Sequence, residues 1–361
     1  MAARDGFVES SSEDQERIRG WALHFAAAKQ AAEYFGRRPR RFSLLFSHPE
    51  GAPLPENAKR IHFVRHGQGA HNVWRAQERA AGRAPHAKRG NFGEVPRGLH
   101  DPDLTDRGLE EAAATQVLAA AACSPQLLVT SPVRRAVQTC LTVFKAAIDR
   151  GVPLLAHELC REQFRGLDPS IYDARRGREA LAREFPQVDF QKYVLPETVS
   201  LTASVSQSNG GAAADAATQL AADPMWWLCG SPLGACEGGT NETSMMEHAY
   251  GFMCWLMSRP EGEVGVATHS LWLLALYYGA FDNPGSNAGG DPHVFYTGEL
   301  RTVLILERPA PATSGGCLAA YGSALLGSGL TGQEQDEVHP QKRARTVGDR
   351  GAVLESLSLG C

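Results

Sequence analysis

The 361-residue sequence lacks the cysteine pattern of a zinc site or of a disulfide framework. Its eight cysteines are scattered without a C-x-x-C pair, and the closest two, Cys229 and Cys236, have no second pair near them. Asp, Glu and His residues also form no cluster with the spacing of metal ligands. We therefore expect reduced, mostly buried thiols, no metal and no cofactor.

Strong charge of one sign is missing as well. A formal net charge of −4 gives no electrostatic reason to expect nucleic acid or an anionic membrane as a partner. The N-terminus has no apolar core, so it is not a signal peptide, and its acidic residues argue against a transit peptide. We expect a cytoplasmic protein. The basic run "QKRAR" at 341–345 raises a nuclear signal as an alternative, although a solvated charge cluster explains it more simply.

Residues 264–281 contain no Asp, Glu, Lys or Arg. A membrane helix needs about 20 predominantly apolar residues, and this run is interrupted by Thr268, His269 and Ser270. A strand, a polar turn and a buried helix explain the run better, so we expect no membrane span.

Predicted strands and helices alternate along the chain. Strands are predicted at 60–66, 126–132, 152–159, 263–269 and 299–307, and helices at 11–36, 104–122, 132–149, 177–185 and 241–260. Residues 73–103 are polar and rich in Gly, Pro and Arg, which predicts a surface loop. Alternating elements of this kind indicate a three-layer α/β/α sandwich with a mostly parallel central sheet.

Two helix starts carry recognisable signals. Thr105 is expected to cap the helix over 104–122, whose apolar side would consist of Leu109, Ala112, Ala113 and Val117. The pair Ser131–Pro132 predicts the N-cap and first residue of the next helix.

The composition divides the chain into three parts. Residues 1–57 form an N-terminal helix and extension, and residues 58–308 form the main domain. An insertion at about 167–240 within that domain is expected to supply a lid over the substrate. Residues 309–361 are rich in Gly, Ser, Pro and charge without periodicity, which predicts a disordered tail.

Polar and charged residues gather where the predicted parallel strands end. These strand ends carry Arg65, His66 and Gly67; Ser131, Arg134 and Arg135; Arg161 and Glu162; and Thr268, His269 and Ser270. Because ligands bind beyond the carboxyl ends of such strands, these side chains should converge on one rim. Arginine forks match phosphate oxygens, and a neutral imidazole is a competent nucleophile toward phosphorus. A protonated carboxyl group can hand a proton to a leaving alkoxide. The set predicts covalent phosphoryl transfer through a phosphohistidine.

The motifs "RHGQGAHN", "LTDRG", "TSPVRRAVQT", "LCREQ" and "THS" resemble those of the histidine phosphatase superfamily, in its phosphoglycerate mutase-like branch. The resemblance covers roughly residues 58–308 and implies the phosphoglycerate mutase-like fold. "ELCRE", "YDARRG", "THSLWLLAL" and "GELRTVLI" look closer still to plant and fungal phosphoglycerate mutase-like proteins. In that group a cysteine stands where this chain has Tyr172, whereas Asp173, Arg175 and Arg176 are retained.

The resemblance also implies roles for individual residues. His66 corresponds to the phosphorylated nucleophile and Glu162 to the proton donor, while Arg65, Arg135 and His269 correspond to the phosphate pocket. The family spacing favours Arg135 over Arg134, which is expected on the helix surface, and His269 is expected to act as a cation or hydrogen-bond donor. Asn72, Gly67, Arg161, Arg175 and Arg176 are further candidates for phosphate or substrate binding. Among these, Gly67 would permit close approach of the phosphoryl group.

Some of these assignments have plain alternatives. The sole role of Glu162 could be to form an ion pair with Arg161. Arg175 and Arg176 could bind an acidic substrate group or simply be solvated. His71 and His100 have no role that the sequence suggests, so both are treated as loop residues.

The expected function is phosphomonoester hydrolysis. Mutases carry a His-Tyr-Gly run after the acidic residue, whereas this chain reads "EQFRGLDPS", which disfavours a mutase. A phosphate-binding scaffold without activity is the alternative from another class, but it would be expected to have lost part of the intact set. The substrate would be a small phosphorylated molecule, with a phosphoprotein as an alternative.

Overall fold

The computed structural model describes residues 12–31, 38, 40–46, 53–83, 98–162, 171–196, 241–282 and 293–309. All of them lie in the compact unit Met1–Gly316, and the second unit, Cys317–Cys361, is outside the described residues. Most of the predicted tail and residues 197–240 of the predicted lid also lie outside them.

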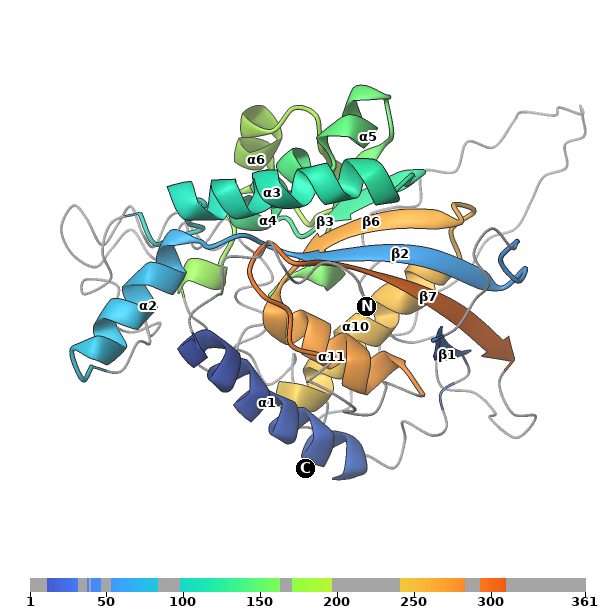
Figure 1. Ribbon diagram of the computed structural model, residues 1–361, viewed down its shortest axis with the longest axis horizontal. Coiled ribbons are helices and arrows are strands. Elements are labelled where there is room, and N and C mark those ends of the chain that lie inside the picture. Colours follow the sequence, from blue (N-terminus) through green and yellow to red (C-terminus); the bar gives the residue numbers. More distant parts are fainter. Residues whose placement is uncertain are drawn as a thin grey trace, which may run out of the picture. The chain divides into compact units, whose positions relative to one another are not determined.

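A seven-stranded sheet forms the centre of the unit, in the order β1-β7-β2-β6-β3-β4-β5 (Figure 1). The strands are β1 (Arg40–Leu45), β2 (Ala58–Arg65), β3 (Leu127–Thr130), β4 (Leu154–His157), β5 (Asp189–Tyr193), β6 (Glu263–Thr268) and β7 (Leu300–Pro309). Five adjacent strands run parallel to one another, in the order β2, β6, β3, β4 and β5. β7 pairs antiparallel with both β1 and β2. The predicted mostly parallel sheet is confirmed.

The sheet has a hydrophobic core on each of its two faces, and helices cover both cores. Along β2, Ile61 and Phe63 belong to one core and Val64 to the other, because successive side chains of a strand point to opposite faces. The helices of the first core are α1 (Ser12–Ala31), α10 (Asn241–Met257) and α11 (Ser270–Ala280). Those of the second are α3 (Asp106–Ala122), α4 (Arg134–Val143), α5 (Lys145–Asp149) and α6 (Arg178–Glu184). Figure 1 shows the two groups on opposite sides of the sheet, which confirms the three layers.

Helix α3 starts where the sequence predicted but buries a different face. Thr105 is its N-cap, and the Thr105 side chain accepts a hydrogen bond from the Gly108 N–H. The buried positions are Gly108, Glu111, Ala112, Thr115 and Ala119. Leu109 and Val117, predicted to be buried, are 45% and 71% exposed, and Ala113 is also exposed. The prediction failed because two polar side chains with hydrogen-bond partners occupy the buried stripe in place of larger apolar ones.

The helix that follows β3 begins later than predicted. Its N-cap is Val133 and its first residue is Arg134, so the prediction of Ser131–Pro132 as cap and first turn was wrong. The helix is also interrupted at Phe144, which separates α4 from α5. Ser131 is instead engaged with an imidazole at the end of β6.

One α-helix and two strands were not predicted. Helix α2 (Ala70–Ala80) replaces the first part of the expected 73–103 loop. Strand β1 lies at one edge of the sheet, and β5, inside the expected lid insertion, forms the other edge. Part of the expected insertion therefore belongs to the sheet. Within the described residues, the apolar stretches of the helices are too short to span a membrane.

Candidate active site

His66 lies directly after β2, beside the end of β6. Its backbone N–H donates to the Thr268 carbonyl over 2.9 Å, which extends the β2–β6 pairing by one residue. The imidazole is 2% exposed, and its Nδ1 lies 2.6 Å from the Gly67 carbonyl oxygen. The Nε of Arg135 donates toward Nε2 over 3.3 Å. Since a carbonyl can only accept and a guanidinium can only donate, Nδ1 carries the proton and Nε2 carries the lone pair.

Arg135 is the centre of the polar cluster. The side chain is fully buried and reaches out from the first turn of α4. Besides the contact to His66, Nη1 donates to the Tyr172 carbonyl over 2.7 Å and Nη2 to the Asp173 carboxylate over 2.8 Å. Nη2 also lies 3.4 Å from Nδ1 of His269. One guanidinium therefore positions both imidazoles, and the carboxylate compensates its charge.

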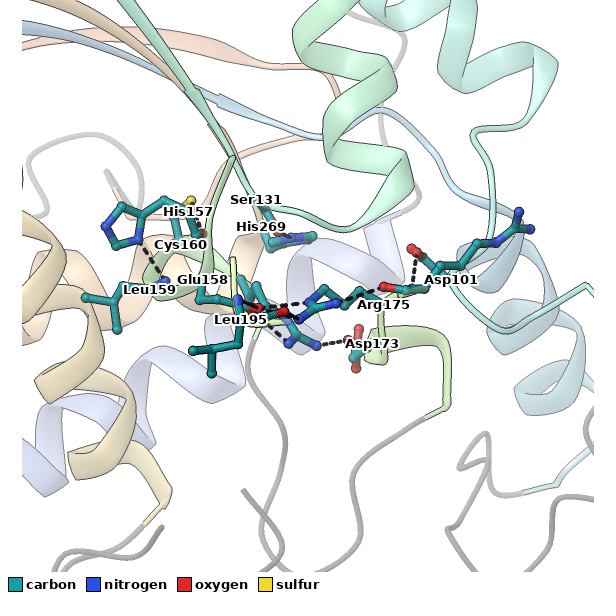
Figure 2. Close-up of polar contacts among 12 residues, drawn as sticks. Asp101, Ser131, His157, Glu158, Leu159, Cys160, Asp173, Arg175, Leu195 and His269 are labelled. Atoms are coloured by element: carbon teal, nitrogen blue, oxygen red, sulfur yellow. Dashed lines mark hydrogen bonds and ion pairs between the residues drawn. The ribbon is translucent and has the colours of Figure 1, made fainter. Parts of the chain in front are cut away.

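His269 follows β6 and caps α11. Its ring centroid is 5.1 Å from that of His66, and its Nε2 lies 2.8 Å from the Ser131 hydroxyl, a contact drawn in Figure 2. Burial, and then the positive charge of Arg135, holds the pKa of His269 well below its usual range. His269 is therefore neutral here. Of the two predicted roles, this disfavours the cation and leaves the hydrogen-bond donor.

Arg65 and Glu162 approach the same rim from β2 and from the segment after β4. Arg65 is 1% exposed, and its Nη1 donates to the Phe295 carbonyl over 2.8 Å. Glu162 is 8% exposed. The Thr268 hydroxyl donates to the Cys160 carbonyl over 2.8 Å, which ties the Glu162 segment to the residue before His269.

The loop after His66 is held by side chains from three helices. The N–H groups of residues 67, 68 and 69 donate to Thr139 of α4 over 3.0 Å, to Glu111 of α3 over 2.8 Å and to Asn72 of α2 over 2.9 Å. All three loop amides are thus engaged within the protein. A phosphate bound here would be held by side-chain donors, unlike in glycine-rich loops that use the backbone.

Two of the predicted phosphate-binding residues also have structural roles here. The Asn72 side-chain oxygen accepts from the Gly69 N–H and closes the start of α2, and the predicted phosphate contact of Asn72 stays a prediction. A Cβ on Gly67 would lie 2.4 Å from the Gly108 carbonyl oxygen. Glycine at 67 is therefore required for packing of the loop on α3, and the predicted close approach of a phosphoryl group stays a prediction.

Arg161 and Arg175 share Glu158 as a buried partner. Nη1 of Arg161 is 3.1 Å from Glu158, and Nη2 donates to the Asp173 carbonyl over 2.9 Å. Arg175 is fully buried, and it donates to Glu158 over 2.8 Å and to the Leu195 carbonyl over 2.7 Å (Figure 2). Arg175 is therefore not a solvated residue, and its contacts connect β5 with the segment after β4 rather than a substrate.

Arg134 and Arg176 lie at the periphery of the cluster. The Arg134 side chain is mostly buried and pairs with Asp103 over 2.6 Å and Glu184 over 2.5 Å. The prediction of a surface helix residue was thus wrong about burial, although the preference for Arg135 at the imidazoles agrees with the geometry. Arg176 is partly exposed, with its guanidinium 3.4 Å from Glu184.

Sequence reasoning missed three residues of the cluster. His71, expected to be a loop residue, is 4% exposed on α2, with its ring centroid 5.6 Å from that of His66. Tyr172 stacks on His71 at 5.2 Å, and Asp173 pairs with Arg135. A helix assigned to residues 70–80 would have placed His71 beside the end of β2, but the polar, Gly-, Pro- and Arg-rich composition of residues 73–103 was interpreted as a surface loop.

Asp101 joins two parts of the rim from a strained backbone position. Its φ is +46°, and its carboxylate accepts from the N–H groups of Arg134 over 2.8 Å and Arg176 over 2.9 Å. Burial raises the pKa of Asp101 to about 6, although the two N–H donors oppose the shift.

This shift predicts a pH-dependent contribution to stability. The folded protein holds the Asp101 proton more tightly than the unfolded chain, so this contribution to the free energy of unfolding falls as the pH rises from about 4 to 6, by about 3 kcal/mol. Urea unfolding of the wild type and of Asp101→Asn at pH 4 and pH 7 measures it. Between pH 4 and pH 7, the free energy of unfolding of the wild type should fall relative to that of Asp101→Asn. A difference between the two proteins that is independent of pH would contradict the raised pKa of Asp101.

The described residues contain no group of three or more His, Cys, Asp or Glu side chains that could hold a metal ion. The groups of the cluster that can donate to an anion are the arginines and the N–H groups of the imidazoles, whereas the Asp173 carboxylate is paired with Arg135.

Several solved structures are similar to this chain. A putative alpha-ribazole-5'-P phosphatase from Escherichia coli is 16% identical, with a TM-score of 0.35, over 72% of this chain and 99% of that one. A phosphoglycerate mutase from Bacillus anthracis is 14% identical, with a TM-score of 0.35, over 69% and 88%. An ecdysone phosphate phosphatase from Bombix mori, in complex with tungstate, is 14% identical, with a TM-score of 0.35, over 74% and 99%. Likenesses of this size carry no argument about activity. No curated protein matches the chain.

The family comparison addresses the motifs themselves. Residues 61–168 match the sequence model of the histidine phosphatase superfamily, branch 1. The matched segment contains His66, Arg135 and Glu162, whereas His269 lies beyond it. The closer likeness to plant and fungal proteins stays a prediction. The strand-end His66 and the arginines at 65 and 135 thus lie in a segment that matches the histidine phosphatase superfamily.

Proposed function

We propose that the protein is a phosphomonoester hydrolase that works through a phosphohistidine at His66. The observation that carries the proposal is the state of the His66 ring. Its Nδ1–H is bound by the Gly67 carbonyl, so the lone pair of Nε2 lies inside the cluster, against Arg135 and 5.1 Å, centroid to centroid, from His269. An imidazole fixed in this tautomer needs no deprotonation before it attacks phosphorus.

In the first step, Nε2 of His66 forms a bond to phosphorus while the ester P–O bond breaks. The leaving alkoxide takes a proton from the carboxylic acid of Glu162. Arg65 and Arg135 place positive charge beside the phosphoryl oxygens, where phosphoryl transfer requires it. For this step the substrate must displace the Nε–H of Arg135 from Nε2, and a phosphoryl oxygen would then accept that N–H.

In the second step, a water molecule attacks phosphorus and the N–P bond breaks, with the electron pair returning to Nε2. The water gives its proton to the Glu162 carboxylate, which restores the acid, and inorganic phosphate leaves. His269 would supply a hydrogen bond without adding charge, because burial and Arg135 keep its pKa low. Since its Nδ1 faces Arg135, its one N–H is on Nε2, and this N–H would turn from the Ser131 hydroxyl to a phosphoryl oxygen.

Hydrolysis is proposed over mutase transfer because residues 162–170 lack the His-Tyr-Gly run of mutases. The substrate class is a small phosphomonoester, with a phosphoprotein as the alternative, and the cytoplasm is the proposed compartment. The arginines and imidazoles described at the rim support a phosphate group as the part of the substrate that binds there.

The test is the hydrolysis of p-nitrophenyl phosphate in EDTA between pH 5 and 7.5, combined with trapping of the intermediate. Protein mixed with ³²P-labelled substrate and quenched in alkali should carry a label that is stable to base and labile to acid, as phosphohistidine is. The label should persist in His24→Asn, which changes an exposed histidine of α1. Wild-type protein with neither turnover nor label would overturn the proposal, and transfer to an added alcohol in excess of hydrolysis would identify a transferase.

A further inference from the structure

His71 is a buried imidazole without a role in the reaction described above. It lies in the first turn of α2 and is 4% exposed, and its Nδ1 has no hydrogen-bond partner in the part of the chain that the structure describes. The ring is held by stacking instead. Tyr172 packs on it at 5.2 Å with an interplanar angle of 27°, and the Tyr172 carbonyl is itself bound by Arg135.

The backbone leaves room for this ring close to the nucleophile. A Cβ on Gly69 would lie 2.7 Å from Nδ1 of His71 and 3.4 Å from Cδ of Arg135. Any residue larger than glycine at 69 would therefore push the imidazole away from the arginine. With its centroid 5.6 Å from that of His66, His71 flanks the nucleophile as His269 does at 5.1 Å.

The charge state of His71 follows from its surroundings. Burial, and then the positive charge of Arg135, holds the pKa of His71 well below its usual range. The ring is therefore neutral and has one N–H donor and one lone pair. It can donate a hydrogen bond to an anion in the cluster without adding a further cation beside Arg135.

A buried polar nitrogen that lacks a partner is unfavourable, and native proteins retain such groups mainly where function uses them. Nδ1 of His71 lies close to residue 69 on the side of Arg135, and the Nε of Arg135 is 3.3 Å from Nε2 of His66. A ligand that enters the cluster at Arg135 could therefore supply the missing partner. A phosphoryl group bonded to Nε2 of His66 brings three strong acceptor oxygens into the cluster.

We propose that His71 is a further phosphoryl-binding residue, whose ring N–H donates to an oxygen of the group that is transferred to His66. The proposal rests on the proposed function. Its ligand class is a phosphate monoester, inorganic phosphate or an oxyanion of the same shape. Tyr172 is the positioning residue that keeps the ring in place through stacking.

The test compares His71→Phe with Trp74→Phe in the full-length protein. The phenyl ring of His71→Phe keeps the stacking on Tyr172 but removes both nitrogens. Orthovanadate is the probe, and its affinity is measured from inhibition of p-nitrophenyl phosphate hydrolysis and from thermal shift. We expect His71→Phe to lose about 10- to 100-fold in vanadate affinity and in kcat/KM, as for a hydrogen bond to a charged group. The unfolding temperature without ligand should stay equal or rise, because an unpartnered buried nitrogen is gone.

Trp74→Phe changes a neighbouring ring of α2, whose centroid is 6.4 Å from that of Tyr172, and should leave vanadate affinity within a few-fold of wild type. His71→Gln retains a side-chain N–H donor and should bind vanadate more tightly than His71→Phe or His71→Leu. This comparison decides the proposal even if one variant folds poorly.

Two results would overturn the inference while the proposed function stands. One is wild-type vanadate affinity in His71→Phe, and the other is a lower unfolding temperature with unchanged affinity, which a purely structural residue would give. Vanadate or phosphate binding that depends on His71 in a wild-type protein without turnover would instead reject hydrolysis and keep the binding role. A wild type that neither hydrolyses the ester nor binds either oxyanion would reject both.

Discussion

Replacing His66 by asparagine is expected to lower the turnover of p-nitrophenyl phosphate by at least about 10,000-fold. Asparagine offers no nitrogen lone pair to attack phosphorus, so the covalent route is lost. Its side-chain N–H can still donate to the Gly67 carbonyl in place of Nδ1. The fold should therefore survive, and the loss should be one of chemistry.

The measurement is kcat/KM together with the ³²P label and the midpoint of thermal unfolding. Vanadate should still stabilise His66→Asn, because the side chains of Arg65, Arg135 and His269 are also held by contacts that do not involve the His66 ring. Residual turnover above one-hundredth of the wild-type rate would show that another group attacks phosphorus. A wild type that is itself inactive but stabilised by vanadate would favour the phosphate-binding scaffold.

Replacing Arg135 by lysine is expected to reduce kcat/KM about 100- to 1000-fold, although the positive charge is kept. The guanidinium contacts His66, Tyr172 and Asp173 at the same time, over distances of 3.3, 2.7 and 2.8 Å. A lysine ammonium is a point donor on a flexible chain and cannot reproduce this fork. Both imidazoles would lose the group that positions them.

Arg134→Lys is the matched control, since Arg134 is the preceding residue and pairs with Asp103 and Glu184 instead. Its kcat/KM should stay within a few-fold of the wild-type value. Steady-state kinetics of both variants, with unfolding midpoints, separates the two arginines. An equal loss in both variants would mean that the spacing had identified the wrong arginine or that α4 as a whole had moved.

The central strands could be predicted because strands buried on both faces read as continuous apolar runs. β3 and β4 are buried at every position. The edge strands do not have this pattern. β1 begins with two arginines, and only one of the five positions of β5 is buried, so neither strand stands out from other polar segments of the sequence.

Site residues at strand ends could be predicted from the sequence. Contacts between residues that lie far apart in the sequence were missed. His66, Arg135 and His269 follow from the order of strands and helices. The pairing of Asp173 with Arg135 joins α4 to a segment 38 residues away, and no periodicity records such a contact. The prediction of Ser131 as a helix cap was wrong for a related reason. Its hydroxyl instead contacts His269, at the end of the neighbouring strand β6.

The anchoring of residues 67–69 by three helices has a consequence for the motion of the loop beside His66. An amide exchanges its hydrogen with solvent only when its hydrogen bond opens, and contacts from α2, α3 and α4 would have to open for this loop to move. Although the loop is not part of a helix or strand, its amides should exchange as slowly as those of the sheet. His66 is thus ordered when the chain folds, and little conformational entropy would remain to be lost if it binds an ester as proposed.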